Sequence, residues 1–229
     1  HIWVTNKNVY ETQAVTASYQ GTTQTFMFMP FPLGWNDSTT APTCTFYQWG
    51  RKDPFPPSNG SNSEITLYAY EFANPTMKKE AQTNIQTSIM NPLTFYGTDT
   101  ASWENTSALD LWNVGNTDTD VNFNLVTKSV YDPSPAGFHL PCTAAFTGFT
   151  QGTKNDTTKG YTFTTNSVNT YWQACGYRAY DTGSLNSVGS YGYYWSAGPS
   201  SITYNGRSLV FGSGDVSPQH HCHRGYGFS

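Results

Sequence analysis

The C-terminal stretch, residues 193–229, constrains the fold more than any other part of the chain, because short apolar anchors alternate there with longer polar segments. The anchors are residues 193–195 (Tyr-Tyr-Trp) and 209–211 (Leu-Val-Phe). The polar segments are rich in Gly and Ser and include the run His-His-Cys-His at 220–223. We predict strands that are fixed by the anchors, with a display segment of about residues 196–227 held between them.

The amino-acid usage of this stretch is selective. Residues 196–229 contain no Trp, Glu, Lys or Met and a single Gln, at Gln219. The types that fill the display positions are His, Ser, Gly, Arg, Tyr, Asp, Thr and Cys. These are reachable from an Asn codon, AAC or AAT, by changing its two adenines, whereas Trp, Gln, Glu, Lys and Met are not. The usage therefore indicates a segment that is diversified at the DNA level. The alternative is a Gly/Ser-rich loop that lacks those residues by chance.

The display segment combines residue types that are common at binding surfaces. Tyr and Arg are enriched as interface anchors, and Ser, Gly and Asn add adaptable hydrogen bonds. The buried frame beneath them is predicted to be Tyr194, Trp195, Leu209, Val210, Phe211 and Phe228. The predicted solvent-facing, ligand-binding residues are Ser200, Ser201, Thr203, Tyr204, Asn205, Arg207, Asp215, Ser217, His220, His221, Cys222, His223 and Tyr226.

Composition and charge restrict the class of protein. Only 11% of the residues are charged and 16% are aromatic, which is typical of extracellular β-rich or loop-rich proteins. The formal net charge is -4 and no basic patch occurs, so nucleic-acid binding is not expected. No apolar run approaches the ~18 residues of a membrane span.

The cysteines leave their redox state open. Cys44, Cys142, Cys175 and Cys222 form no CxxC pair and no zinc-type spacing. Four cysteines allow three disulfide pairings, and the spacing selects none of them. Free buried thiols are an equal alternative.

Patterns along the chain predict one helix and several short strands. The helix starts at Asn74-Pro75 and ends at Asn91-Pro92. Its apolar stripe of Met77, Ala81, Ile85 and Ile89 is expected to be a core face, with a ligand groove as the alternative. Strands are expected at residues 1–5, 45–49, 177–180 and 191–195, and a hairpin arm within 155–171. No internal repeat emerges. We predict a single α+β domain over residues 1–229, excised from a longer protein, with much ordered loop.

Five phrases, in this order, carry a family resemblance. They are residues 46–55 (FYQWGRKDPF), 91–96 (NPLTFY), 131–138 (YDPSPAGF), 194–196 (YWS) and 224–229 (RGYGFS). Together they resemble the FISUMP-type domain of surface and pilus-associated proteins of gut anaerobic bacteria. The sequence departs from the family at Ser134, where a Cys is expected, which puts any family disulfide at that position in doubt.

The resemblance implies a C-type-lectin-like fold in which the N- and C-terminal strands, residues 1–5 and 225–229, pair. The tail further resembles the variable proteins of diversity-generating retroelements, in which a fixed scaffold presents substituted side chains. These resemblances imply an adhesin domain on the surface of a Gram-negative bacterium, associated with a pilus tip or the outer membrane. The implied partners are a protein or glycan ligand on a host or microbial surface, and pilus shaft subunits.

Neither a metal nor a cofactor is predicted. Alternate side chains of an extended strand point to opposite faces, so His221 and His223 share one face and His220 and Cys222 the other. Two ligands per face do not close a tetrahedral zinc site. The triplet Trp35-Asn36-Asp37 has no companion ligands for a calcium cage.

Motifs for catalysis are also missing. The chain has no GxSxG, HExxH or Gly-rich phosphate loop, so we predict ligand binding without enzymatic activity. A structural or stalk domain without a ligand of its own is the first alternative. An oxidase that uses Cys222 is the second, because C-type-lectin folds host formylglycine-generating enzymes.

Overall fold

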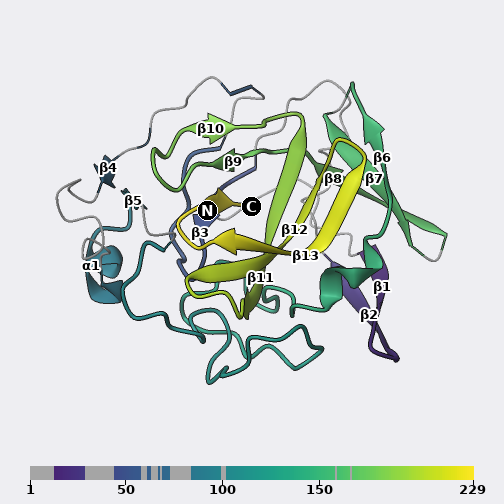
Figure 1. Cartoon of the computed structure of the whole chain (residues 1–229), viewed down its shortest axis with the longest axis horizontal. Helices are drawn as coiled ribbons and strands as arrows, with labels where there is room; N and C mark the ends of the chain where they lie inside the picture. The colour runs from purple at the N-terminus through teal and green to yellow at the C-terminus, as the bar shows by residue number, and fades with distance from the viewer. Residues whose placement is uncertain are drawn as a thin grey trace.

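Strands, rather than helices, form most of the regular structure (Figure 1). The computed structural model describes residues 13–28, 44–57, 61–62, 67, 69–72, 84–98, 102–157, 159–165 and 167–229. Within these ranges the strands form five sheets, and every strand pair is antiparallel except one, β4–β5.

The sheets are small, and most join strands that are close in sequence. The exception is the four-stranded sheet, which brings together segments from both ends of the described chain. The sheets are β1 (Gln13–Tyr19) with β2 (Thr22–Phe28); β10 (Leu185–Asn186), β9 (Tyr177–Arg178), β14 (Gly227–Phe228) and β3 (Tyr47–Gln48); β11 (Tyr191–Pro199), β12 (Asn205–Gly212) and β13 (Asp215–His223); β4 (Ala69–Phe72) with β5 (Thr94–Gly97); and β6 (Gly152–Asn155), β7 (Gly160–Thr165) and β8 (Val168–Gln173).

The predicted fold class, α+β with one main helix, is therefore wrong for the described chain. Its helical content is one turn and a half of α-helix, α1 (Ile85–Met90), and a short 3-10 helix, η2 (Ala145–Gly148). Sheets and long irregular segments supply the rest. The same finding corrects the α+β class that the resemblance implied, whereas the C-type-lectin-like relationship stays a prediction.

Helix α1 begins later than predicted because a capping residue precedes it directly. The side-chain oxygen of Asn84 accepts a hydrogen bond from the Thr87 N–H at 2.7 Å, which satisfies one of the free donors of the first turn. Asn84 itself has extended backbone angles, so the helix starts at Ile85. The predicted start at Asn74-Pro75 lies outside the described residues.

The apolar stripe of this helix is only partly in the core. Ile85 packs against a buried cluster, but Ile89 is 53% exposed. The prediction that the stripe forms a continuous core face is thus wrong at Ile89, whereas Met77 and Ala81 fall outside the described residues.

The predicted hairpin arm is confirmed. Tyr161 and Phe163 of β7 are buried, while Thr164 on the other face is exposed. β7 pairs with β8 in register from Gly160↔Gln173 to Thr165↔Val168. Alternation of buried and exposed side chains is what a sheet with one face on the core requires.

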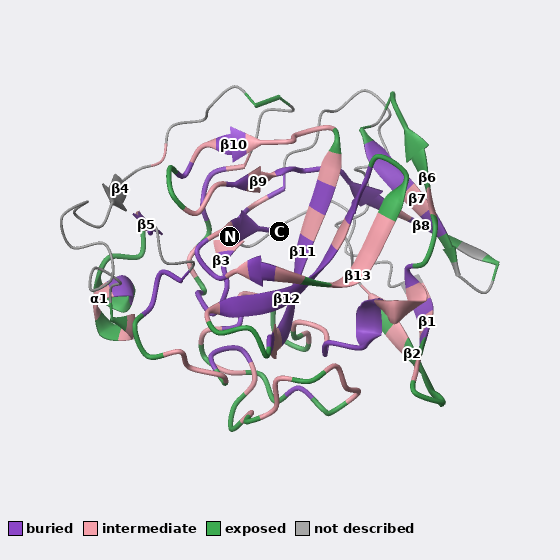
Figure 2. Ribbon diagram, viewed as in Figure 1, coloured by how far each residue is buried: buried purple, intermediate pink, exposed green. Residues whose placement is uncertain are grey.

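Buried aromatic side chains fill the core. The segments that carry buried residues are purple in Figure 2. One cluster lies beside the four-stranded sheet, and a second lies between η2, the β7–β8 hairpin and β12. Trp49, Trp103, Trp112, Trp195 and Phe228 belong to the first, and Phe146, Phe149, Phe163, Trp172 and Phe211 to the second. Each aromatic side chain buries ~150–250 Å², which compensates for the low aliphatic content.

Hydrogen bonds join four of the five phrases that carry the family resemblance. The Gln48 side-chain amide donates to the carbonyls of Tyr96 and Gly225, at 2.9 and 2.8 Å. The Trp195 indole N–H donates to the Tyr47 carbonyl at 2.9 Å. The four phrases therefore fold together as one part of the structure.

The fifth phrase forms a separate turn. The buried carboxylate of Asp132 accepts hydrogen bonds from the backbone N–H groups of Ser134 and Leu140, at 2.7 and 2.9 Å, and pairs with Lys128 at 2.9 Å. Ser134 contributes its backbone here. The turn thus holds with Ser at the position where the family has Cys.

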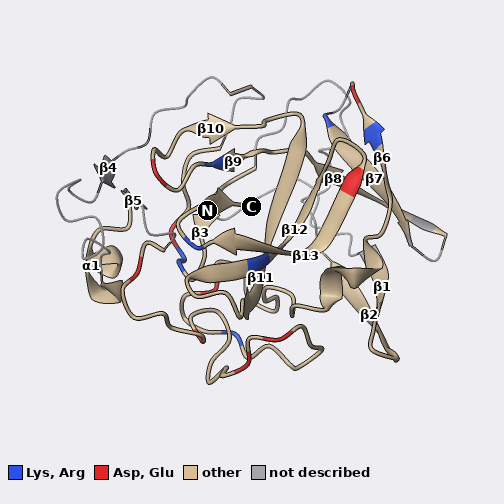
Figure 3. Ribbon diagram, viewed as in Figure 1, with Lys and Arg blue, Asp and Glu red and all other residues tan. Residues whose placement is uncertain are grey.

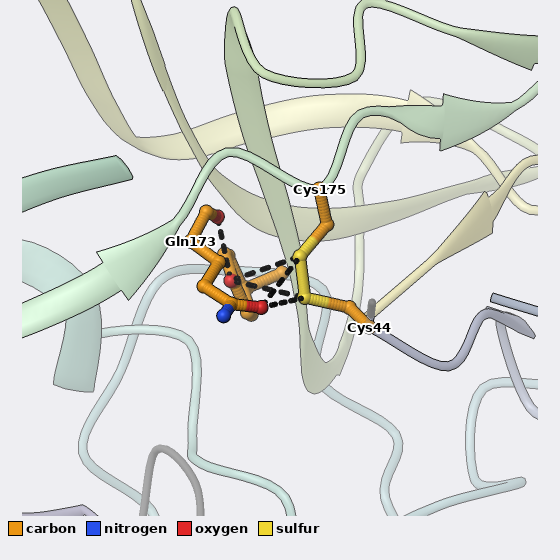
Figure 4. Close-up of a disulfide and its surroundings, with 4 residues drawn as sticks. Cys44, Gln173 and Cys175 are labelled. Carbon is orange, nitrogen blue, oxygen red and sulfur yellow. Dashed lines mark hydrogen bonds between the residues drawn. A yellow bond between two sulfur atoms is a disulfide. The ribbon is translucent and has the colours of Figure 1, made fainter. Parts of the chain in front are cut away.

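A disulfide joins Cys44 to Cys175 across 131 positions of sequence (Figure 4). It lies in a third buried cluster with Phe46, Phe55 and Phe95. The Gln173 side-chain oxygen is 3.4 Å from the Cys44 sulfur. Cys142 and Cys222 are buried free thiols, so the pairing that the sequence left open is Cys44–Cys175.

The C-terminal strand is paired, but with partners other than the predicted one. Gly227 of β14 pairs with Gln48 of β3 and with Arg178 of β9. Ser229 exchanges backbone hydrogen bonds with Trp195 and Tyr193 of β11 at 3.1 Å each. Residues 1–5, the predicted partner, lie outside the described residues.

Candidate recognition surface

The predicted display segment forms the antiparallel sheet β11–β12–β13, with β12 in the centre and β13 at an edge of the sheet (Figure 1). A two-residue turn, Ser213-Gly214, joins β12 to β13, and both of its residues have positive φ, 50° and 92°. Such a turn matches the twist of a hairpin, and Gly is well suited to its second position.

The predicted frame is confirmed except at one residue. Tyr194, Trp195, Leu209, Phe211 and Phe228 are all buried, whereas Val210 is half-buried. Tyr194 and Leu209 lie directly opposite each other in the sheet. The frame thus holds both faces of the sheet against aromatic side chains of the two core clusters.

Strand β13 is irregular in its middle. Ser208 pairs with His220 and Val210 with Ser217, so the two residues Pro218 and Gln219 stand opposite Leu209 alone. An extra residue of this kind is a β-bulge, and proline is tolerated at such a place because its missing N–H breaks no ladder bond.

The exposure of the predicted contact residues divides them into three groups (Figure 2). Ser201, Thr203, Asp215 and His220 are exposed, as predicted. Tyr204, Ser217, His221, His223 and Tyr226 are half-buried and reach the surface in part. Ser200, Asn205, Arg207 and Cys222 are buried, so the prediction that they face solvent is wrong.

Different contacts bury these four residues. The Ser200 N–H donates to the Asn205 carbonyl at 2.9 Å, and the Ser200 hydroxyl accepts from the Ile202 N–H at 3.0 Å. Arg207 donates to the Thr119 carbonyl, and the thiol of Cys222 packs in the first core cluster. The sequence pattern of Gly and Ser did not reveal these contacts.

The histidines occupy distinct environments. His221 lies opposite Arg207 and His220 opposite Ser208, which confirms that neighbouring side chains alternate between faces. Burial lowers the pKa of all three, and for His221 the positive charges of Arg207 and His220 lower the pKa further. All three rings are therefore predominantly neutral at pH 7.

The described residues offer no cluster of His, Cys, Asp or Glu that could hold a metal ion. Burial raises the pKa of the Cys222 thiol to about 12, while the Ser208 hydroxyl beside it lowers the pKa slightly. A thiol with such a pKa is protonated at neutral pH, and only the thiolate is a strong nucleophile. In the described ranges no helix is long and apolar enough to cross a membrane.

A group of half-buried tyrosines lies beside the histidines, and we call Tyr177, Tyr180, Tyr193 and Tyr226 the tyrosine cluster. The Tyr177 ring meets the Tyr193 and Tyr226 rings edge to face, with centroids 5.0 and 5.2 Å apart, and Tyr180 meets Tyr226 at 4.9 Å. The rings thus support one another over Phe228, which stacks at 5.4 Å from Tyr226.

The hydroxyl groups of the tyrosine cluster can form hydrogen bonds with a ligand. Within the described part of the chain none of the four donates or accepts a hydrogen bond. Burial raises the pKa of Tyr177 and Tyr193 and raises that of Tyr226 to about 12, so these hydroxyls stay protonated. His223 extends the cluster, since its ring centroid is 4.9 Å from that of Tyr180.

Three members of the cluster, Tyr177, Tyr180 and Tyr193, were not among the predicted contact residues. They precede the segment of selective codon usage, and Tyr193 resembles its buried neighbour Tyr194 in sequence. The density of Tyr between residues 177 and 194 was the available sign, because paratope-like surfaces are rich in Tyr.

Comparisons of the chain with known protein families, with characterised proteins and with solved structures found no match.

Proposed function

We propose that the chain is a ligand-binding domain of an adhesin, displayed on the surface of a Gram-negative bacterium at a pilus tip or on the outer membrane. Its recognition surface consists of the tyrosine cluster together with the exposed and half-buried residues of β13 and of the turn before β12. The ligand is a protein or glycan on a host or microbial surface, and pilus shaft subunits are further partners.

The tyrosine cluster is the observation that carries this proposal. Tyr side chains provide a large contact area at low conformational cost, and each has a hydroxyl for a specific hydrogen bond. Here the rings are held by edge-to-face contacts while their hydroxyls are free of partners in the described chain. Such a surface is prepared for a ligand, because little freedom is lost when it binds.

Two further observations support a surface location. A disulfide such as Cys44–Cys175 persists in oxidising compartments, outside the cytoplasm. Charged residues are few and scattered over the described chain, as Figure 3 shows, which is typical of extracellular proteins. In the strands of the recognition surface, β12 has one charged residue, Arg207, and β13 has one, Asp215. The recognition surface therefore relies on neutral polar and aromatic contacts, and nucleic acid is not a proposed partner.

The proposal includes no enzymatic activity. An oxidase of the formylglycine-generating type needs a reactive thiol, and Cys222 has its pKa raised to about 12 by burial beneath the tyrosine cluster. Cys222 belongs to the buried cluster against which Tyr177, Tyr193 and Tyr226 pack.

Screening of the labelled chain against glycan and surface-protein arrays tests the proposal, followed by the same screen with Tyr193→Ser/Tyr226→Ser. We expect a ligand whose affinity falls at least about tenfold in the double variant, as interface tyrosines often contribute that much. Leu125→Ser, at a site that is 82% exposed and outside the recognition surface, is the matched control and should bind normally.

Equal loss in both variants, or binding that neither variant changes, would refute the tyrosine cluster as the recognition surface. A chain that captures only pilus subunits, through residues outside this surface, would instead be the structural or stalk domain. Coding sequences from sibling strains provide a second check, because the proposal requires substitutions to concentrate at Asn-type codons within about residues 196–227.

A further inference from the structure

The guanidinium of Arg207 is a buried cation with an incomplete set of partners. Arg207 is 7% exposed, and its Nε and Nη2 donate to the Thr119 carbonyl at 3.3 and 3.0 Å. Its Nη1 has no partner among the described residues, and none of their carboxylates lies within ion-pair distance. Nη1 is not one of the buried unpartnered atoms of the described residues, so this donor reaches solvent although most of the Arg207 side chain is covered. The guanidinium therefore offers a free donor to a ligand at the surface.

The other buried arginines show what a structural arginine looks like in this protein. Arg51 and Arg224 each contact a carboxylate, at 2.6 and 2.9 Å, and Arg178 donates to carbonyl groups from all three of its nitrogens. Their partners are Asp53, Gln48 and Thr94 for Arg51; Glu104, Ala108 and Asn205 for Arg224; and Pro56 and Gly183 for Arg178. Arg207 has neither a carboxylate nor a full set of carbonyls.

Two acidic residues are near Arg207 without neutralising it. Burial lowers the pKa of Arg207, and the negative charges of Asp120 and Asp118 only partly oppose that effect. The Asp118 carboxylate is already used, since it accepts from the Asp120 N–H and from the Asn122 side chain at 2.8 Å each. Arg207 thus keeps an unsatisfied donor next to a surface strand.

His221 provides a second donor on the same face of the sheet. It stands directly opposite Arg207, and cross-strand neighbours have Cβ atoms about 4.5–5.5 Å apart. The Ser200 hydroxyl lies 2.5 Å from His221 Nδ1. The Ser200 oxygen accepts from the Ile202 N–H, and its own hydrogen can be donated to Nδ1. In the tautomer that accepts this hydrogen, the ring proton of neutral His221 is on Nε2, and this is the tautomer that the subsite uses.

We propose that Arg207 and His221 form a subsite for a carboxylate group of the ligand, with Ser200 as the residue that positions His221. The guanidinium Nη1 and the imidazole Nε2 each donate to the carboxylate, which supplies the counter-ion that Arg207 lacks. Guanidinium and imidazole donors to a carboxylate make strong, charge-assisted hydrogen bonds.

This inference rests on the proposed function and specifies the chemistry of part of its site. A carboxylate occurs in acidic sugars and in the acidic side chains or C-terminus of a protein. The probes therefore include acetate alone, N-acetylneuraminic acid, and a short peptide that contains glutamate. Chloride tests whether any small anion is attracted to the site. Methyl acetate, which has no charge, tests whether the carboxylate charge is needed.

Side-chain NMR of the histidines in the full chain is the measurement. We expect acetate to shift the His221 resonances saturably and to raise the pKa of His221, because a bound anion favours the protonated ring. Chloride and methyl acetate should have no saturable effect. Arg207→Gln should weaken acetate binding about tenfold or more, as expected for loss of a hydrogen bond to a charged group.

Leu125→Ser, at a site that is 82% exposed and outside the recognition surface, is the control and should leave acetate binding unchanged. Ser200→Ala should weaken binding while Ser200→Thr, which keeps the hydroxyl, restores it. The affinities for the sugar acid and for the glutamate peptide are then compared, and a difference of about tenfold or more would identify the source of the carboxylate. Tighter binding of either probe supports the subsite.

Lack of a saturable acetate effect in the wild-type chain would overturn the inference, as would an equal response to chloride. This measurement does not depend on whether a variant folds. It is also separate from the array screen, because a ligand bound through the tyrosine cluster alone would preserve the proposed function while the carboxylate subsite failed.

Discussion

Gly206 shows how closely a single position inside the predicted display segment is tied to the core. A Cβ atom built on Gly206 would lie 2.5 Å from Cδ1 of Trp49, which is fully buried. The Trp49 ring is itself held by Trp112 at 5.4 Å and by the Arg224 guanidinium at 4.3 Å. The ring therefore has little room to move.

We expect Gly206→Ala to lower the free energy of unfolding by about 1–3 kcal/mol through overpacking. Urea denaturation measures the loss. Ser201→Ala, at an exposed position of the preceding turn, should change stability by less than about 0.5 kcal/mol. Equal stabilities for the two variants would show that the Trp49 ring can shift to make room for the added methyl group.

The histidines of β13 should make the stability of the fold depend on pH. Burial lowers the folded-state pKa of His220, His221 and His223 below the usual value, so the unfolded chain binds protons more readily. Their contribution to stability is complete above about pH 6.5 and is lost as the pH falls from there through the folded-state pKa values.

Unfolding midpoints in urea should therefore be lower at about pH 5.5 than at about pH 7.5, and the difference should shrink when all three histidines are replaced by Asn. Ser201→Ala should keep the full pH dependence. A triple variant with undiminished pH dependence would assign the effect to other groups.

At the scale of elements, strand β12 connects the recognition surface to the core. Phe211 meets Tyr161, Phe163 and Tyr194 with ring centroids 4.9, 5.1 and 6.0 Å apart. We expect Phe211→Ala to cost about 3–5 kcal/mol, because it removes these contacts and leaves a cavity. Ser217→Ala on the neighbouring strand should change little, and thermal unfolding compares the two.

What the sequence predicts about elements depends on how local the interactions are. The β7–β8 hairpin and the frame residues follow from short-range alternation, and both predictions are confirmed apart from the half-buried Val210. The helix was misjudged because a four-residue apolar period does not show whether anything packs against it, and Ile89 is exposed. The α+β class came from that helix and from the resemblance, and the sheets overturn it.

The proposed recognition surface was less predictable from the sequence, because its residues meet through contacts between distant segments. Tyr177 of β9, Tyr193 of β11 and Tyr226 meet only because β14 and β11 are neighbours through the hydrogen bonds of Ser229. The burial of Arg207 depends on Thr119, 88 positions away in sequence. Neither contact has a signature within one segment.

At the scale of the whole molecule, the disulfide connects the segment before β3 to the segment before β9. Closing a loop of 131 residues restricts the unfolded chain strongly, and removing such a native disulfide typically costs about 2–5 kcal/mol. We expect a reductant to lower the free energy of unfolding of the wild-type chain by about this much, which is measured as a lower midpoint in urea.

Cys44→Ala/Cys175→Ala should have the low midpoint with or without reductant, and Cys142→Ala should keep the reductant sensitivity of the wild type. Peptide mapping without reduction should recover residues 44 and 175 in one linked species. A wild-type chain that ignores the reductant would contradict the linkage.

The bulge at Pro218 has a consequence for the proposed variation of β13. An edge strand offers free backbone groups that can pair with the edge of another chain, and proteins reduce this hazard with proline, bulges and short strands. β13 has a proline and a bulge together in its middle, opposite Leu209. New side chains can therefore be tried along β13 while the strand remains a poor template for aggregation, whatever the substitutions on either side of Pro218.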